Sequence, residues 1–338
     1  MMFRTAYTLI SQNTHPLTCK HDEFDYFVKP AVNSNKVIRM NVERGSRMRA
    51  GKKIRVGTRG SKLAVKQANL VIAALQKQFP EIEVEKVLIR TEGDKNLDKP
   101  LPEFGGKGVF VSELEGALLS KEIDLAVHSA KDMPTELDKN LMIAGVLPRE
   151  DARDILVTKG AEDLPEGRKK PSDAGFVIGT GSPRRQLQIK ELYPKALCKG
   201  LRGNITTRLQ KLRDGEYNGI ILAAAGLKRL GLLEEEDLEY QFFSYEEMLP
   251  AGGQGIIAIE GRKDDAAAKM VQEISDAETF AELEAERDVL RKLNAGCHEA
   301  VGVLAQHDGT KIRLRTVCDK EGQIFLQDEI IDQELKIN

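Results

Sequence analysis

From residue 53 onward, short apolar segments alternate with segments whose apolar residues recur at helical spacing. The apolar run 53–58 precedes a helical pattern at 63–79, and a second apolar run covers 83–91. A helical pattern at 108–120 then leads into the apolar run 123–130. These periods distinguish strands from amphipathic helices. Strands that alternate with helices predict parallel sheets with helices packed on their faces, which is an α/β fold.

The sequence LPREDARD at 147–154 interrupts this alternation, and a second series begins after it. The predicted elements are a strand at 176–182, a helix at 183–193, a strand at 196–200, a helix at 204–215 and a strand running into a loop at 219–231. The segment 246–260, with a proline and clustered glycines, indicates a second crossing between units. Two crossings predict that the first domain resumes after the second, so that two hinged lobes enclose a cleft.

A third unit follows the second crossing. A helical pattern covers 277–293, Gly296 and Cys297 come next, and apolar runs at 301–306, 312–318 and 323–329 predict strands. We therefore expect four parts along the chain: a disordered or non-native extension at 1–51, a first domain at 52–149 plus 254–274, a second domain at 153–250 and a third domain at 276–338.

The composition of the 338 residues argues against several classes of protein. The 51 basic and 53 acidic side chains give a formal charge of −2, which disfavours nucleic acid as a partner. The four cysteines form no CxxC pair, so neither a disulfide framework nor a metal site is expected. No apolar run is long enough to cross a membrane, and the first residues lack the apolar core of a secretory signal. We expect a cytoplasmic protein that binds no membrane.

At three places a predicted strand ends in a glycine-containing turn, a helix start and arginine. The residues concerned are Arg59 and Ser61, then Ser182, Arg184 and Arg185, then Arg202, Gly203 and Arg208. Helix N-termini attract anions, and arginine adds a fork that binds carboxylate or phosphate. A single such turn is usually an ordinary capped helix, but three at the same topological position, each after a strand, predict several anion sites. Because no phosphate-loop or dinucleotide motif accompanies them, carboxylates are favoured over nucleotides.

Three further positions admit both a chemical and a structural interpretation. The predicted strand at 123–130 delivers Ser129, Lys131 and Asp132 together, either as an acid/base group among cations or as a surface ion pair worth less than about 1 kcal/mol. Lys107, in a GGKG loop, belongs either to a lid or to a solvated loop. Cys297 is either a reactive thiol or a packing residue. The residues alone leave these alternatives open.

Eight motifs, taken in order, resemble those of porphobilinogen deaminases: VGTRGSKLA, FGGKGVF, DLAVHSAKDMPT, GTGSPRRQ, LRGNITTRL, AAAGLKRLG, LPAGGQG and AGCH. One of them alone would mean little, whereas eight in order are highly specific. The resemblance implies a transferase that joins four porphobilinogen molecules head to tail into hydroxymethylbilane, with release of ammonia, in tetrapyrrole biosynthesis.

The resemblance also implies a fold and a cofactor. Two lobes like those of type II periplasmic binding proteins, with mainly parallel sheets, precede a smaller α/β domain with an antiparallel sheet. Cys297 matches the cysteine that carries a dipyrromethane cofactor, made from two substrate molecules, through a thioether. Asp132 matches the catalytic aspartate, which would act as general acid toward the departing ammonia and then as counter-ion to the cation that forms.

Other matching residues would bind the acetate and propionate groups of the pyrroles. Those that would hold the cofactor are Ser129, Lys131, Thr180, Ser182, Arg184, Arg185 and Gly203. Those that would bind the incoming substrate are Arg59, Ser61, Lys107, Arg202, Arg208, Arg229 and Gln254. The resemblance implies no metal and a monomer.

Three features depart from the family pattern. The extension at 1–51 has no counterpart in typical bacterial members, and His298 and Glu299 follow Cys297 without the family's proline. The chain also ends where members continue into a further helix, which would expose apolar sheet surface in the third domain. A non-enzymatic solute-binding protein is the alternative function, but it gives Cys297 and Asp132 no role. A phosphate-using enzyme would need the missing phosphate-loop motif.

Overall fold

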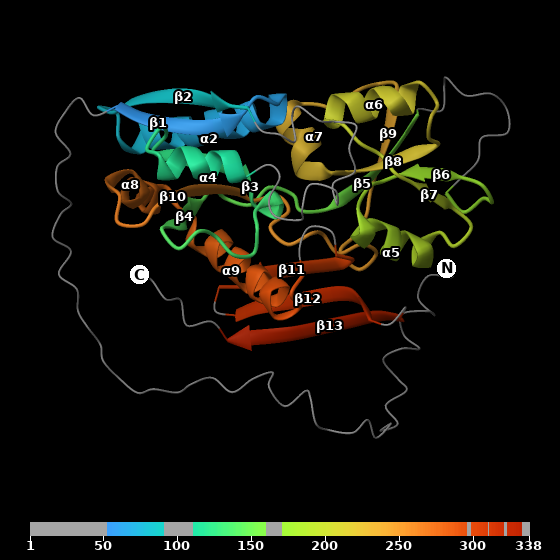
Figure 1. The fold of residues 1–338 in the computed structure, drawn as a ribbon. Coiled ribbons are helices and arrows are strands. Elements are labelled where there is room, and N and C mark those ends of the chain that lie inside the picture. The colour runs from blue at the N-terminus through green and yellow to red at the C-terminus, as the bar shows by residue number, and fades with distance from the viewer. Residues whose placement is uncertain are drawn as a thin grey trace. The chain divides into compact units, whose positions relative to one another are not determined.

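The structure is a computed structural model that describes residues 53–90, 111–159, 171–295, 299–309, 311–320 and 323–332 (Figure 1). The extension predicted at 1–51, together with Lys107 and Cys297, lies outside these residues. The described strands form three sheets, of five, five and three strands. Within the same residues, no helix is both long enough and apolar enough to span a bilayer.

The first sheet has the strand order β2-β1-β3-β10-β4. Its strands are β1 (Lys53–Arg59), β2 (Glu83–Ile89), β3 (Leu125–Ser129), β4 (Leu141–Val146) and β10 (Ile257–Arg262). β1 pairs in parallel with β2 and β3, whereas β10 runs antiparallel to both β3 and β4. β10 therefore belongs to this sheet, although all five strands of the second sheet precede it in the chain.

The second sheet has the strand order β7-β6-β8-β5-β9. Its strands are β5 (Asp154–Lys159), β6 (Val177–Gly179), β7 (Leu197–Lys199), β8 (Gly219–Ala223) and β9 (Leu238–Phe242). β6 pairs in parallel with β7 and β8, whereas β5 runs antiparallel to β8 and β9. In both sheets, the strand that follows a crossing is fourth in the order and runs antiparallel to both of its neighbours.

The two five-stranded sheets share this strand order, and the predicted α/β class with a smaller antiparallel sheet at the C-terminal end is confirmed. Each five-stranded sheet contains two parallel and two antiparallel pairings, because the crossing strand enters from the opposite direction. The domain boundaries stay a prediction. They are supported by the segments that share a sheet, since 53–146 pairs with 257–262 and 154–242 forms a sheet of its own.

Helices accompany the strands of both sheets, as the alternating pattern predicts. They are α2 (Lys62–Gln78), α4 (Ser112–Leu119) and α8 (Ala266–Ile274) around the first sheet, and α5 (Pro183–Leu192), α6 (Ile205–Arg213) and α7 (Ala224–Leu230) around the second. Side-chain caps set several of these helix starts, including those of α2 and α6. Ser61 Oγ accepts from the Ala64 N–H at 3.2 Å, and Asn204 Oδ1 accepts from the Thr207 N–H at 2.9 Å.

The segment 219–231 corrects one prediction. We expected a strand running into a loop, but β8 ends at Ala223 and α7 follows directly. Alanine is the strongest helix former, and it occupies the first two positions of α7. Gly231 ends the helix in the left-handed conformation, with φ at +68°. A helix of seven residues makes too few turns to show a helical period, which is why the apolar pattern hid it.

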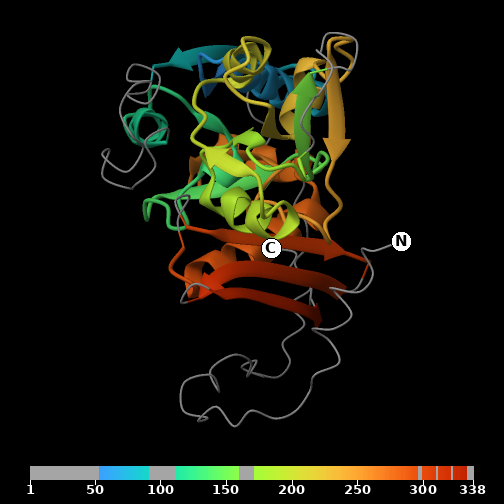
Figure 2. The same ribbon diagram turned by 90° about the vertical axis from the view of Figure 1, so that its right-hand side faces the viewer.

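The third sheet is antiparallel, with the order β11-β12-β13. Its strands are β11 (Val301–His307), β12 (Lys311–Lys320) and β13 (Gln323–Asp332). Helix α9 (Ala277–Lys292) packs on it through an aliphatic core that includes Val303 and Leu314 (Figures 1 and 2). β13 exposes the apolar side chains of Leu326 and Ile330, at 49% and 68% of their surface.

A buried ion pair ties α9 to both crossings. Arg149, in the first crossing, places Nη1 2.7 Å from Oε1 of Glu286, whose side chain is fully buried in α9. Glu286 Oε2 accepts from the main-chain N–H of Gly253, in the second crossing, at 2.6 Å. Its Oε1 also accepts from the main-chain N–H of Ala305, in β11, at 2.8 Å. One carboxylate therefore holds both crossings and the third sheet together.

The Glu286→Ala change should destabilise the fold strongly. It leaves Arg149 buried without this partner and frees two main-chain N–H groups, and breaking a buried pair costs about 3–5 kcal/mol. Asp328→Ala is the matched control, because the pair of Arg313 and Asp328 is about half exposed and such pairs contribute less than about 1 kcal/mol. Urea unfolding measures both changes. Equal losses in the two variants would contradict the role given to Glu286.

Candidate active site

The turn after β3 presents Lys131 and Asp132. It is a single 3-10 turn, η2 (Ala130–Asp132), whose first residue is 4% exposed and so anchors it in the core. Ser129 Oγ, at the end of β3, accepts from Gln67 Nε2 of α2 at 2.9 Å. Asp132 itself is exposed. The predicted acid/base carboxylate therefore lies on an anchored turn where a ligand can reach it.

The turn after β6 leads into α5. Thr180 is buried, and its Oγ1 accepts from the Ser182 N–H at 3.2 Å. Ser182 is the N-cap residue and Pro183 the first residue of the helix, as predicted. The Ser182 side chain makes no capping hydrogen bond within the described residues. Arg184 and Arg185 follow in the first turn of α5 and are both buried, with 3% and 6% of their surface exposed.

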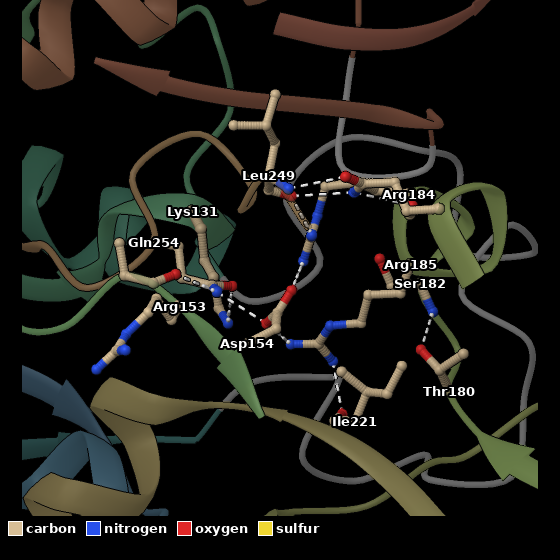
Figure 3. A network of polar contacts seen from close by, with 12 residues as sticks. Lys131, Arg153, Asp154, Thr180, Ser182, Arg184, Arg185, Ile221, Leu249 and Gln254 are labelled. Carbon is tan, nitrogen blue, oxygen red and sulfur yellow. Dashed lines mark hydrogen bonds and ion pairs between the residues drawn. The ribbon is translucent and has the colours of Figure 1, made fainter. Parts of the chain in front are cut away.

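A carboxylate that the sequence analysis did not single out, Asp154, binds both arginines (Figure 3). Asp154 is the first residue of β5 and is fully buried. Its Oδ2 accepts from Arg184 Nη2 and its Oδ1 from Arg185 Nη2, both at 2.7 Å. The Nη1 atoms donate to main-chain carbonyls, of Leu249 at 2.5 Å and of Ile221 at 2.8 Å. Burial alone would raise the pKa of Asp154, but the two guanidinium groups hold it well below its usual range.

Gln254, from the second crossing, connects this group to the turn after β3. Its Nε2 donates to Asp154 Oδ1 at 2.9 Å and to the carbonyl of Ala152 at 2.8 Å. Its Oε1 accepts from Lys131 Nζ at 3.4 Å. The Gln254 side chain is itself buried. A chain of hydrogen bonds therefore runs from Lys131, after β3, through Gln254 in the second crossing, to Asp154 and the two arginines of α5.

The turn after β7 adds a further cation. Arg208 Nε donates to the carbonyl of Gly203 at 2.6 Å, which folds the arginine back over the start of α6. Gly203 has φ at +110°, and a Cβ there would lie 2.9 Å from the Thr207 side chain, so the turn requires glycine. Burial lowers the pKa of Arg208 to about 10. Arg185 contributes to this lowering and Asp132 opposes it, so Arg208 lies within electrostatic reach of both.

Lys131 lies close to the arginine pair and is held partly out of water. Burial lowers the pKa of Lys131 to about 8, and Arg185 and Arg184 act in the same direction, while Asp132 and Asp154 oppose them. A group of cations held partly out of water favours the approach of negative charge. The arrangement therefore suits a ligand that carries several carboxylates.

Most of the predicted site residues fall into three sets. The structure brings together Lys131, Asp132, Arg184, Arg185, Arg208 and Gln254. Arg229 instead donates from Nη2 to the carbonyl of Gly255, in the second crossing, at 2.6 Å, and Ser61 caps α2. Lys107 and Cys297 lie outside the described residues. Within the described residues, no group of three or more His, Cys, Asp or Glu could hold a metal ion.

Known proteins match this chain over most of its length. Residues 54–270 match the family model described as porphobilinogen deaminase, dipyromethane cofactor binding domain. The chain belongs to the porphobilinogen deaminase family. The porphobilinogen deaminase of Acetivibrio thermocellus is 46% identical over 81% of this chain and 90% of its own length. That of Syntrophobacter fumaroxidans is 44% identical over 80% of this chain and 85% of its own.

Membership of the porphobilinogen deaminase family confirms the predicted class of enzyme, a transferase of tetrapyrrole biosynthesis, and its dipyrromethane cofactor. Among solved structures, the periplasmic VFT2 domain of BvgS from Bordetella pertussis is 14% identical over 71% of this chain and 92% of its own, with a TM-score of 0.40. At that score the likeness carries no argument about fold or function.

The cations fit the cofactor of the porphobilinogen deaminase family. Its pyrroles carry acetate and propionate groups, and Lys131, Arg184 and Arg185 supply positive charge from both sheets. The Nε atoms of Arg184 and Arg185 are buried and have no hydrogen-bond partner among the described residues. Buried N–H groups are nearly always hydrogen-bonded, so these two donors fit a bound carboxylate.

The Gly253→Ala change should displace the turn that carries Asp132. Gly253 has φ at +74°, and an added Cβ would lie 2.9 Å from Ala130 Cβ and 3.0 Å from the Lys131 nitrogen. We expect turnover to fall about tenfold to a hundredfold, because small misplacements of reacting groups have effects of that size. Gly116→Ala is the matched control, since Gly116 lies within α4 with open space around it. Unchanged turnover in Gly253→Ala would show that the turn accepts the extra carbon.

Carboxylate binding by Lys131 should weaken as the pH rises through about 8. The pKa of Lys131 is lowered from 10.5 to about 8, so the side chain is charged below that pH and neutral above it. Cofactor assembly from porphobilinogen, followed by intact mass, should therefore slow above about pH 8. Lys131→Arg should not slow there, because a guanidinium group stays charged. The same decline in both proteins would assign the pH dependence to another group.

Proposed function

We propose that this chain condenses four porphobilinogen molecules into hydroxymethylbilane on a dipyrromethane attached to Cys297, with Asp132 as the acid/base group. The observation that carries the proposal is the position of Asp132. Its carboxylate is exposed on an anchored turn, within electrostatic reach of Lys131 from its own sheet and of Arg208 from the second sheet. This is a carboxylate placed among cations that bind acidic substrates.

Asp132 has a defined task in this reaction. It would protonate the amino group of porphobilinogen as the carbon–nitrogen bond breaks, so that ammonia leaves. The carboxylate that remains would then be the negative charge nearest to the substrate cation. Positioned acid/base groups contribute about 10² to 10⁴ in rate, and stabilisation of the cation adds to that.

The cofactor would be held chiefly by the second sheet. When bound, the dipyrromethane supplies the pyrrole position to which porphobilinogen is joined. Arg184 and Arg185 would bind its carboxylates through the donors that have no partner among the described residues. Lys131 would add a charge from the first sheet. The remaining residues proposed to line this part of the site are Ser129, Thr180, Ser182 and Gly203.

The incoming substrate would meet a separate set of cations. The residues proposed for it are Arg59, Ser61, Lys107, Arg202, Arg208, Arg229 and Gln254. Two of these have contacts that involve the second crossing: Arg229 donates to the carbonyl of Gly255, and Gln254, in the crossing itself, donates to Asp154. Arg229 and Gln254 would therefore affect substrate binding partly by fixing the conformation of the second crossing. We further propose that the enzyme acts as a monomer in the cytoplasm and binds neither nucleic acid nor membrane.

The experiment that tests the proposal is the intact mass of the protein purified from cells that make porphobilinogen. We expect a surplus equal to two porphobilinogens less two ammonia, located on the peptide that contains Cys297. Cys297→Ser should lose the surplus, whereas Cys198→Ser, which removes an exposed thiol, should keep it. Asp132→Asn should keep the surplus and lose about 99% of turnover or more, while Asp214→Asn, at an exposed carboxylate, should lose none.

Three results would count against the proposal. A wild-type protein with the bare polypeptide mass, which gains none when porphobilinogen is added, would favour a solute-binding protein. A full surplus in Cys297→Ser would place the attachment elsewhere. More than about a tenth of wild-type turnover in Asp132→Asn would remove Asp132 as the general acid.

A further inference from the structure

We propose that Asp154 is a positioning residue for cofactor loading, which holds the guanidinium groups of Arg184 and Arg185 in the alignment that receives carboxylates. The inference rests on the proposed function, in which this arginine pair binds the dipyrromethane. Asp154 is fully buried, so it would act through the arginines and not by touching the ligand.

Arg184 and Arg185 are each fixed by hydrogen bonds at two points. Each guanidinium group donates once to Asp154, at 2.7 Å, and once to a main-chain carbonyl. In the part of the chain that the structure describes, no other carboxylate bonds to Arg184 or Arg185. A side chain held at two points has lost its rotational freedom before a ligand arrives, so less entropy is lost on binding. The Nε donor of each arginine remains for the ligand.

Asp154 also offsets the electrostatic repulsion between the two arginines. Arg184 and Arg185 are consecutive in the chain, both are more than nine-tenths buried, and both reach the same carboxylate. Two cations that close together in a medium of low dielectric repel strongly. The negative charge of Asp154 offsets this repulsion and leaves one net positive charge on the group of three. Without Asp154, the arginines would be driven apart and would lose their alignment.

Asp154 is also connected, through Gln254, to Lys131 in the turn after β3 of the first sheet (Figure 3). Gln254 donates to the Asp154 oxygen that also accepts from Arg185, and it accepts from Lys131. Asp154 begins β5, directly after the first crossing, whereas Gln254 lies in the second crossing. The same carboxylate therefore sets the spacing between the arginine pair and the lysine next to Asp132. A ligand with several carboxylates needs that spacing to be fixed.

A second carboxylate in this chain provides a matched control. Asp124 also bridges two arginines, since it accepts from Arg55 Nη2 at 2.9 Å and from Arg262 Nη2 at 3.3 Å. It is mostly buried, with a side chain 14% exposed, but neither of its arginines belongs to the candidate site. Neutralising Asp124 therefore perturbs the fold in the same chemical way without touching the cofactor residues.

The test compares Asp154→Asn with wild type and Asp124→Asn, all produced in cells that make no porphobilinogen. Loading is followed by intact mass at increasing porphobilinogen concentrations, below the unfolding temperature of each protein. In Asp154→Asn we expect the half-saturating concentration to rise about tenfold or more, with the maximal rate changed less than about threefold. Asp124→Asn should lower the unfolding temperature and leave the half-saturating concentration unchanged.

The outcomes separate this inference from the proposed function. An unchanged half-saturating concentration in Asp154→Asn overturns the positioning role and leaves the proposed function standing. A lower maximal rate with an unchanged half-saturating concentration also overturns the positioning role. Partial unfolding gives that result, because it removes active molecules without changing the affinity of the rest. A wild-type protein that never gains mass overturns both. If Asp154→Asn does not fold, Asp154→Glu keeps the charge but shifts both arginines, and the same rise is expected.

Discussion

Cations that bind a chain of carboxylates must share a small volume, and their mutual repulsion is the constraint that organises this site. The fold meets it with one buried carboxylate, Asp154, between two guanidinium groups, and with hydrogen bonds that fix each cation before a ligand arrives. Burial lowers the pKa of Lys131, and the two arginines act in the same direction, so that it lies at about 8. The positive charge is therefore concentrated but not fully neutralised, which is the condition for binding an acidic substrate.

The two crossings of the chain determine where those charges meet. β5 leaves the first crossing and β10 follows the second, and each runs antiparallel to its neighbours in a sheet that it enters from the other unit. Asp154 and Gln254 lie at these crossings, so the hinge itself contributes polar groups to the site. Glycine at 253 lets the second crossing lie directly against the turn that carries Asp132. Hinge and active site are therefore built from the same residues.

Much of this arrangement could be predicted from the sequence, because local patterns encode it. The apolar run before Ser129 predicts a buried strand, and Ser182 followed by Pro183 predicts a helix start, so the positions of Asp132 and of the arginine pair follow. Asp154 could not be predicted in the same way. It lies in a run of alternating charges that looks solvated, and its burial depends on partners about 30 and 100 residues away. Long-range pairing of this kind leaves no periodic trace in a single sequence.

The ion pair of Arg149 and Glu286 has a mechanical consequence. It fastens α9 to both crossing segments, and any rotation of one five-stranded sheet against the other must take place about those segments. A point near the axis of a rotation travels a shorter arc than a point at its rim. The chain continues from α9 to Cys297 within five residues of Lys292. Helix α9 would therefore move little while the two five-stranded sheets rotate about the crossings.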